Sequence, residues 1–158
     1  MAREKALKGH SKGTKGYSKG TKRVVEREKG STDNLCSVWV FTNVDREGKF
    51  AFDVSRGDFR HKDVMEKLIE YSRMTWRAIK NHTHDKGKSK HHYLSYKSLS
   101  KDAQDRFMAK KLEKDSDALF SFALNNTLRI VGIREGEKFK VLWYDPKHEV
   151  CPSAKKHT

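Results

Sequence analysis

The pattern of apolar and polar residues predicts that the folded part of the chain begins with β-structure. Residues 37 to 44 read SVWVFTNV, in which β-branched and aromatic residues crowd together as they do in strands. DREG at residues 45 to 48 supplies a turn, and KFAFDV at residues 49 to 54 resumes the apolar alternation. We therefore expect these segments to pair as a hairpin.

Helical spacing replaces this alternation between His61 and His82. One face is expected to be buried, and it consists of Met65, Leu68, Ile69, Ser72, Thr75, Trp76 and Ile79. The polar residues 82 to 92 then read as a loop. Ser100 can cap a second, partly exposed helix that runs to Leu112.

The remaining apolar segments predict a three-stranded meander. Its strands are ALFSFAL at 118 to 124, LRIVGIRE at 128 to 135 and KFKVLWYD at 138 to 145, and HEVC at 148 to 151 can add a short edge strand. The fold class that follows is α+β, with one mixed, mainly antiparallel sheet of about five strands and one or two helices packed on one face.

Composition separates the N-terminus from this pattern. GHSKGTK at residues 9 to 15 is followed at once by GYSKGTK, and neither copy has the apolar spacing needed to form a core. Residues 1 to 30 hold ten Lys and Arg against three Glu, so they carry half of the net charge of +14. We expect residues 1 to 33 to be a flexible basic arm and residues 34 to 158 to be a single α+β domain.

The net charge favours a polyanionic partner, with RNA first among them. The residues expected to contact RNA are Lys12, Lys15, Lys19, Lys22, Arg23, His84, Lys86, Lys88, Lys90, His91, His92 and Tyr93, with Tyr96 as a further stacking residue. The alternative reading of residues 82 to 97 is an ordinary solvated loop. A protein-interaction module whose charge serves solubility is a third class of function.

Other partners and compartments are less consistent with the sequence. No apolar run approaches the roughly 20 residues that span a bilayer, and the basic N-terminus lacks the apolar stretch of a signal peptide. Seven candidate zinc ligands are scattered without a C-x-x-C or compact quartet: Cys36, His82, His84, His91, His92, His148 and Cys151. We expect a cytoplasmic protein with reduced thiols, no membrane partner, no metal and no cofactor.

Two strands of the meander carry the residues that could perform chemistry. Strict alternation places Arg129, Val131 and Ile133 on one side, with Ile130, Gly132 and Arg134 on the other. On the next strand, Phe139, Val141 and Trp143 are expected to alternate with Lys140, Leu142 and Tyr144, Trp143 being a packing residue. Glycine within a strand marks a bulge or a close approach by another group, and Arg134 is expected to point toward that opening.

The turn after the last strand can be read in two ways. In the functional reading, His148 exchanges a proton near neutral pH and Asp145 orients it. In the structural reading, Asp145 opens an Asx-type turn before Pro146, and His148 is an ordinary surface residue. The spacing alone leaves both readings open.

Three segments together carry a resemblance to known proteins: MTWRAI at residues 74 to 79, RIVGIRE at 129 to 135 and FKVLWYDPKHEV at 139 to 150. Over about residues 65 to 152 the chain resembles a group of small bacterial and mobile-element proteins with an R-x-x-G-x-R and F-x-x-L-W-x-D-x-x-H signature. Its order of elements more distantly resembles the RelE-type toxin fold of small metal-independent endoribonucleases.

The second resemblance implies cleavage of RNA by attack of a ribose 2′-hydroxyl on the neighbouring phosphate. Arg129 or Arg134 would hold the phosphate, because a guanidinium can meet two of its oxygens together. His148 would be the acid or base, with Tyr144 or a loop histidine as its counterpart. The partners implied are RNA, ribosome-associated in the RelE class, and an antitoxin protein. The alternative is a noncatalytic nucleic-acid-binding accessory protein.

Overall fold

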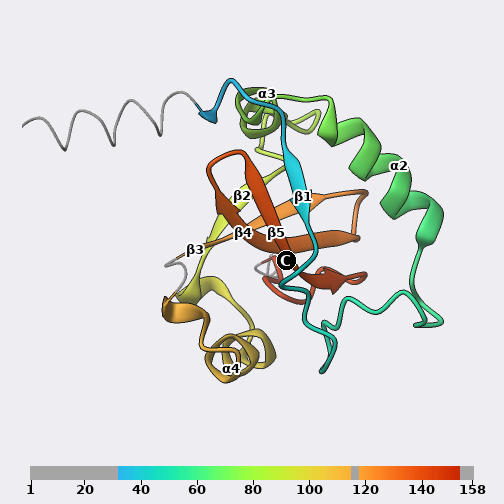
Figure 1. Ribbon diagram of the computed structural model, residues 1–158, viewed down its shortest axis with the longest axis vertical. Coiled ribbons are helices and arrows are strands. Elements are labelled where there is room, and N and C mark those ends of the chain that lie inside the picture. Colours follow the sequence, from blue (N-terminus) through green and yellow to red (C-terminus); the bar gives the residue numbers. More distant parts are fainter. Residues whose placement is uncertain (1–31, 115–117, 154–158) are drawn as a thin grey trace, which may run out of the picture.

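The computed structural model describes residues 32–114 and 118–153 (Figure 1). Five of the expected RNA contacts lie outside the described residues, namely Lys12, Lys15, Lys19, Lys22 and Arg23. Most of the segment predicted to be a basic arm lies outside them as well. The fold and the site are therefore built from the remainder of the chain.

Five strands form one mixed sheet in the order β1-β5-β4-β3-β2. The strands are β1 (Val38–Val40), β2 (His92–Ser95), β3 (Ala118–Ala123), β4 (Arg129–Glu135) and β5 (Lys138–Asp145). β2 to β5 are antiparallel neighbours, whereas β1 pairs with β5 in parallel. The prediction of an α+β fold with a mixed, mainly antiparallel sheet is confirmed.

The predicted opening hairpin is wrong. The segment after β1 follows β5 instead of returning along β1: the Asp45 amide donates to the Leu142 carbonyl at 2.9 Å, and the Tyr144 amide donates to the Phe50 carbonyl at 3.0 Å. Phe50 and Phe52 are both buried, but in different cores. Their alternation therefore reflects burial on two sides of an irregular segment.

The long predicted helix is two helices, α2 (His61–Ser72) and α3 (Trp76–Asn81). Thr75 begins the second helix, because its hydroxyl accepts a hydrogen bond from the Ala78 amide at 3.2 Å. The break changes which residues are buried. Val64, Leu68 and Tyr71 face the core from α2, whereas Met65 and Ile69, predicted to be buried, are 55% and 48% exposed.

The sheet separates two apolar cores. α2 and α3 cover one face, where their side chains pack with Phe120, Phe122, Ile130, Phe139, Val141 and Tyr144. α4 (Lys101–Ala109) covers the other face, where Ala103 and Phe107 pack with Leu94, Leu119, Val131, Ile133, Leu142 and Trp143. Figure 1 shows α2 and α4 on opposite sides of the strands. Both faces are thus apolar, which explains the long buried runs of β3, β4 and β5.

The elements around α4 depart from the sequence prediction at two points. Ser100 caps α4 as predicted, its hydroxyl accepting from the Ala103 amide at 3.3 Å. The 3-10 turns η1 (Tyr96–Ser98) and η2 (Leu112–Lys114) flank the helix. β2 was not predicted, and residues 148 to 151 form a turn instead of an edge strand. The carbonyl of Val150 accepts from the Ser100 amide at 2.8 Å, which ties that turn to α4.

A bulge interrupts the ladder between β4 and β5. Val131 is opposite Trp143, but Gly132 is opposite Val141, so Leu142 is the additional residue. A Cβ on Gly132 would lie 2.2 Å from the Lys140 carbonyl oxygen, which is why only glycine fits. The close approach predicted for Gly132 is confirmed. The opening toward which Arg134 was expected to point is filled, since the same Cβ would lie 2.7 Å from the Phe139 ring.

Candidate functional site

The bulge places Asp145 on the same face of the sheet as Arg129. Phe139 and Val141 face α2 and α3, and strict alternation would have sent Trp143 and Asp145 to that face too. Because of the additional Leu142, Trp143 packs on the α4 side and Asp145 follows it. Asp145 is the register partner of Arg129 at the end of the ladder, and paired residues share a face.

Arg129 is an almost fully buried cation at this corner of the sheet, with 6% of the residue exposed. Its guanidinium curls over the β3–β4 turn and donates to the carbonyls of Asn125 at 2.6 Å, Leu128 at 3.0 Å and Asn126 at 3.2 Å. Its Nε atom is buried and has no hydrogen-bond partner among the described residues. Since a buried donor without a partner is costly, this N–H is an unsatisfied and enclosed polar group at the corner.

Asp145 holds the turn that follows β5. Its two carboxylate oxygens accept hydrogen bonds from the amides of Glu149 and Val150, both at 2.9 Å, and the residue is 1% exposed. This is the turn-forming role of the structural reading. The turn also fixes His148, which adopts a left-handed φ of 57° that is uncommon for residues other than glycine. Asp145 therefore positions His148 through the backbone.

A second histidine reaches this corner from the edge strand. His92 lies opposite Ser121 in the β2–β3 ladder, two residues from Leu94, which packs in the α4-side core. His92 therefore lies on the same face as Arg129 and Asp145, and it is exposed. From the sequence, His92 was predicted to lie in a loop. Had HYLS been recognised as a strand, its alternation with the buried Leu94 would have shown that His92 lies on the α4 side of the sheet.

The charge of Arg129 acts on both histidines. Burial lowers the pKa of His148, Arg129 and His92 lower it further, and the Asp145 carboxylate opposes them. Partial desolvation lowers the pKa of His92, and Arg129 and His84 act in the same direction. Burial also lowers the pKa of Arg129, although a guanidinium remains protonated near neutral pH. The corner thus combines one fixed positive charge with two histidines whose pKa values are lowered from the ordinary range.

Arg134 does not belong to this corner. It lies five residues along β4 from Arg129, about 16 Å in an extended strand, and near the opposite end of the sheet. Its guanidinium lies 4.3 Å from the ring centroid of Trp76 and forms an ion pair with Asp33 at 2.5 Å. Arg129 and Arg134 were alternatives for holding a phosphate, and of the two only Arg129 lies at the end of the ladder that carries Asp145.

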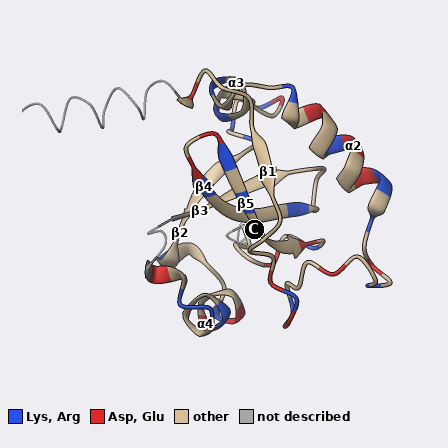
Figure 2. Ribbon diagram, in the orientation of Figure 1, with Lys and Arg blue, Asp and Glu red and all other residues tan. Residues whose placement is uncertain are grey.

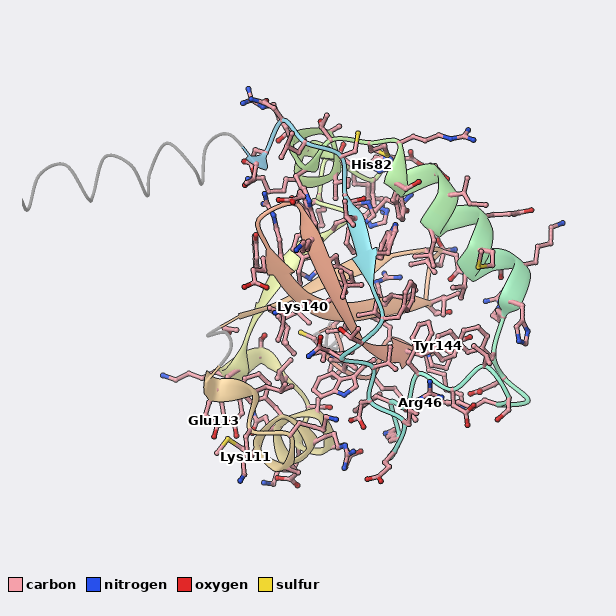
Figure 3. The ribbon with its side chains drawn as sticks, in the orientation of Figure 1. Arg46, His82, Lys111, Glu113, Lys140 and Tyr144 are labelled. Carbon is pink, nitrogen blue, oxygen red and sulfur yellow. The ribbon has the colours of Figure 1, made fainter. Side chains whose placement is uncertain are left out.

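Tyr144 is also removed from the predicted grouping. It is fully buried on the α2 face, and its ring stacks on Phe59 with centroids 4.5 Å apart. Its hydroxyl donates to the Asp58 carbonyl at 2.9 Å and accepts from the Arg60 amide at 3.0 Å. Figure 3 shows it beside the segment that leads to α2. Its hydroxyl is used to hold that segment.

The prediction that His91 contacts RNA is corrected as well. His91 is 2% exposed, and its Nδ1 accepts a hydrogen bond from the Ala123 amide at 3.0 Å. Its proton must then be on Nε2, which lies 3.3 Å from Nδ1 of His82 at the end of α3 (Figure 3). Burial lowers the pKa of His91 to about 3. His91 is a neutral structural residue that closes the end of β3.

The other residues expected to bind RNA lie at the surface. His84, Lys86 and Lys88 are exposed, Lys90 is half-buried, and Tyr93 is 50% exposed. The Tyr93 hydroxyl lies 3.4 Å from an Arg134 nitrogen, which places that ring on the α2 side of the sheet. Figure 2 shows basic and acidic residues interspersed along α2 and α4. Neither of these helices carries charge of only one sign.

The described residues contain neither a candidate metal centre nor a helix that could span a membrane. Within residues 32–114 and 118–153, no three or more His, Cys, Asp or Glu side chains are grouped so as to hold a metal ion. Among the helices of the described part, none has both the length and the apolar character that would carry it across a membrane.

Comparison with known proteins gave no match among family models, curated proteins or solved structures. The RelE-type resemblance consequently stays a prediction. The geometry of Arg129, Asp145, His148 and His92 is the basis for a functional proposal.

Proposed function

We propose that the protein binds RNA and cleaves it at the corner formed by Arg129, Asp145 and His148. The observation that supports this most directly is the unpartnered Nε–H of Arg129, a buried cation whose charge acts on His148. A phosphodiester oxygen that reached this enclosed corner would satisfy that N–H and offset the buried charge. The excess positive charge of the whole chain favours a polyanionic substrate.

The chemistry that fits these groups is attack by the ribose 2′-hydroxyl on the adjacent phosphorus. Arg129 would stabilise the negative charge that develops on the phosphoryl oxygens. His148 would transfer a proton, and Asp145 would keep its ring in place through the turn. The products would be a 2′,3′-cyclic phosphate and a free 5′-hydroxyl. The protein's side chains perform every step of this scheme.

A cleavage assay with matched nucleic acids tests the proposal. Fluorescent single-stranded RNA and DNA of one sequence are incubated with the purified protein, and translating ribosomes serve as a second RNA substrate. Wild type should cleave RNA and leave DNA intact, because DNA lacks the 2′-hydroxyl. His148→Asn should reduce the rate by about 100-fold or more, because general acid–base catalysis contributes at least that much.

Each variant is expected to keep the native fold, so that a loss of cleavage can be assigned to the missing imidazole. Asn tolerates the left-handed backbone of position 148, so the turn should persist when the imidazole is removed. His61→Asn is the matched control, since His61 is an exposed histidine on α2. It should cleave like wild type. If wild type cleaves neither free nor ribosome-bound RNA, the enzyme proposal is rejected.

A noncatalytic nucleic-acid-binding protein is the second candidate. The observation that favours it is the exposed basic loop with Lys86 and Lys88, which can neutralise phosphates without any chemistry. Binding should then weaken steeply as salt rises and should be unchanged in His148→Asn. Binding to RNA and DNA without cleavage of either would establish this alternative.

A further inference from the structure

Two consecutive side-chain hydrogen bonds close the base of the loop that joins α3 to β2. The Ala123 amide at the end of β3 donates to Nδ1 of His91 at 3.0 Å, so the proton of His91 is on Nε2. That Nε2 lies 3.3 Å from Nδ1 of His82, the residue that follows α3, and His82 must therefore be the acceptor. Burial, with the positive charges of Lys90 and Arg129 nearby, holds the pKa of His91 at about 3, so His91 stays neutral.

We propose that His82 is a pH-dependent latch: its neutral ring holds the loop of residues 83 to 90 closed, and its protonation releases the loop. A protonated imidazole has an N–H at both nitrogens, so it would present a donor to the donor of His91. His91 cannot turn away, because it is 2% exposed and its other nitrogen accepts from Ala123. His82 is half-buried, so it is the ring that can move into solvent.

The loop has few other contacts that could keep it closed. The Lys90 amide donates to the His82 carbonyl at 2.8 Å, and the His84 amide donates to the Lys88 carbonyl at 2.9 Å. Both bonds lie within the loop and its ends. Residues 83 to 89 are all exposed, so little packing opposes a local opening once the bond between the two histidine rings is lost.

The charged groups around His82 favour its neutral form while the loop is closed. Burial lowers the pKa of His82, and the charge of Lys90 lowers it further. Glu70 of α2 acts in the opposite direction, whereas Lys67 of α2 and His84 of the loop again lower it. A ring released into solvent approaches the ordinary pKa of 6.5. Because the open form binds the proton more readily, a fall in pH below 6.5 shifts the equilibrium toward the open form.

The same loop carries Lys86 and Lys88, whose exposed charges can neutralise phosphates. Protonation of His82 adds a third charge, and a polyanion that binds the loop favours the protonated, open form in return. RNA binding should therefore strengthen as the pH falls. This consequence rests on the proposed function, whereas the opening of the loop does not.

Amide hydrogen exchange followed by NMR from about pH 7.5 to about pH 5 tests the latch. Protection factors, which correct for the intrinsic effect of pH, should fall by about tenfold or more for the amides of Lys90 and His84 as His82 is protonated. The Ala123 amide should stay protected, because its acceptor on His91 remains neutral. An equal loss at Ala123 would mean that the whole domain unfolds, and unchanged protection of the loop amides would also overturn the latch.

His82→Asn separates the latch from other titrating groups. Its amide oxygen can accept from His91 in place of Nδ1 and does not titrate in this range, so its loop amides should keep their protection as the pH falls. His82→Gln takes its place if the Asn side chain leaves the loop open at neutral pH. His84→Asn is the matched control, since it removes an exposed histidine of the same loop and should open as wild type does. Opening of the His82→Asn loop at low pH would overturn the proposal.

Fluorescence anisotropy with single-stranded RNA distinguishes the latch from the proposed function. As the pH falls over the same range, the gain in affinity should be larger in wild type than in His82→Asn by about fivefold or more. Equal gains would remove the link between the latch and RNA. If wild type binds no RNA at any pH, the proposed function fails, while hydrogen exchange still decides whether His82 holds the loop.

Discussion

Arg129 and Asp145 lie opposite each other at the end of the β4–β5 ladder, yet each side chain makes its hydrogen bonds to backbone groups. Arg129 donates to carbonyls of the β3–β4 turn, and Asp145 accepts from the amides of the turn that carries His148. Opposite charges thus fix two neighbouring turns at one corner of the sheet. This arrangement leaves the Arg129 Nε–H without a partner among the described residues, and the charge of Arg129 lowers the pKa of His148.

We predict that Asp145→Asn destabilises the protein and makes His148 less basic. An amide has one acceptor oxygen, so one of the amides of Glu149 and Val150 loses its partner at a cost of about 1–3 kcal/mol. The pKa of His148 should fall, because the carboxylate that raises it is gone. Urea unfolding measures the first effect and NMR titration the second. If the pKa of His148 does not change, Asp145 has no electrostatic influence on His148.

Gly132→Ala should be among the most destabilising single substitutions. The added methyl group would lie 2.2 Å from the Lys140 carbonyl oxygen, and backbone on both strands must move to relieve the overlap. We expect a loss of about 3 kcal/mol or more in the free energy of unfolding. Gly57→Ala is the control, since a Cβ there meets no atom within 4 Å. Equal stability of the two variants in chemical denaturation would contradict this account of the bulge.

The buried His91 should make the fold sensitive to acid. Its pKa is about 3 in the folded protein against an ordinary 6.5, so below pH 6.5 the unfolded chain binds a proton that the folded one does not. Stability should therefore fall as the pH drops from 6.5 toward 3, by at most about 1.4 kcal/mol per pH unit from this group.

His91→Gln tests the origin of that acid sensitivity. The amide oxygen can still accept from the Ala123 amide, but the side chain does not titrate in this range. Urea unfolding between pH 7 and 4 should show a shallower loss of stability than in wild type. His61→Asn, which alters an exposed histidine, should keep the wild-type slope. An unchanged slope in His91→Gln would assign the effect to other groups.

Arg106 should be needed to hold the segment after β1 against α4. Asp45 is 1% exposed and accepts hydrogen bonds from Arg106 at 2.5 and 2.6 Å and from the Trp143 indole at 3.1 Å. Burial raises the pKa of Asp45, but the hydrogen bonds from Arg106 and Trp143 outweigh it and lower that pKa. Arg106→Met would remove the two short hydrogen bonds of the buried carboxylate and leave the longer contact with Lys110 at 4.0 Å as its only ion pair, at a cost of about 3–5 kcal/mol.

Thermal and urea unfolding measure the effect of Arg106→Met. Lys101→Met is the matched control, because it removes an exposed ion pair with Asp105 on the same helix. It should leave stability almost unchanged. Adding Asp45→Asn to Arg106→Met should recover part of the loss, since the buried charge is removed. Failure to recover would mean that the packing of the Arg106 side chain, and not the charge, is responsible.

The local pattern of the sequence was sufficient to predict the elements that consist of continuous apolar runs or of apolar residues at helical spacing. β3, β4, β5 and α4 follow from apolar runs bounded by turn residues, and Ser100 marks the start of α4 because its hydroxyl satisfies a free amide. Gly132 indicated a close approach before the partner was known. These features are local, so they are readable along the chain.

Only the tertiary structure decided how these elements combine. The parallel pairing of β1 with β5, the burial of His91 and the exposure of Met65 depend on partners distant in sequence. The grouping of the site residues is the clearest case. The resemblance to RelE-type toxins grouped Arg134 and Tyr144 with Arg129 and His148, whereas strand length separates Arg134 from Arg129 and burial removes Tyr144 from the corner. A single additional residue in β5 turns Asp145 to the face of Arg129, because one residue reverses the side to which a strand's later side chains point.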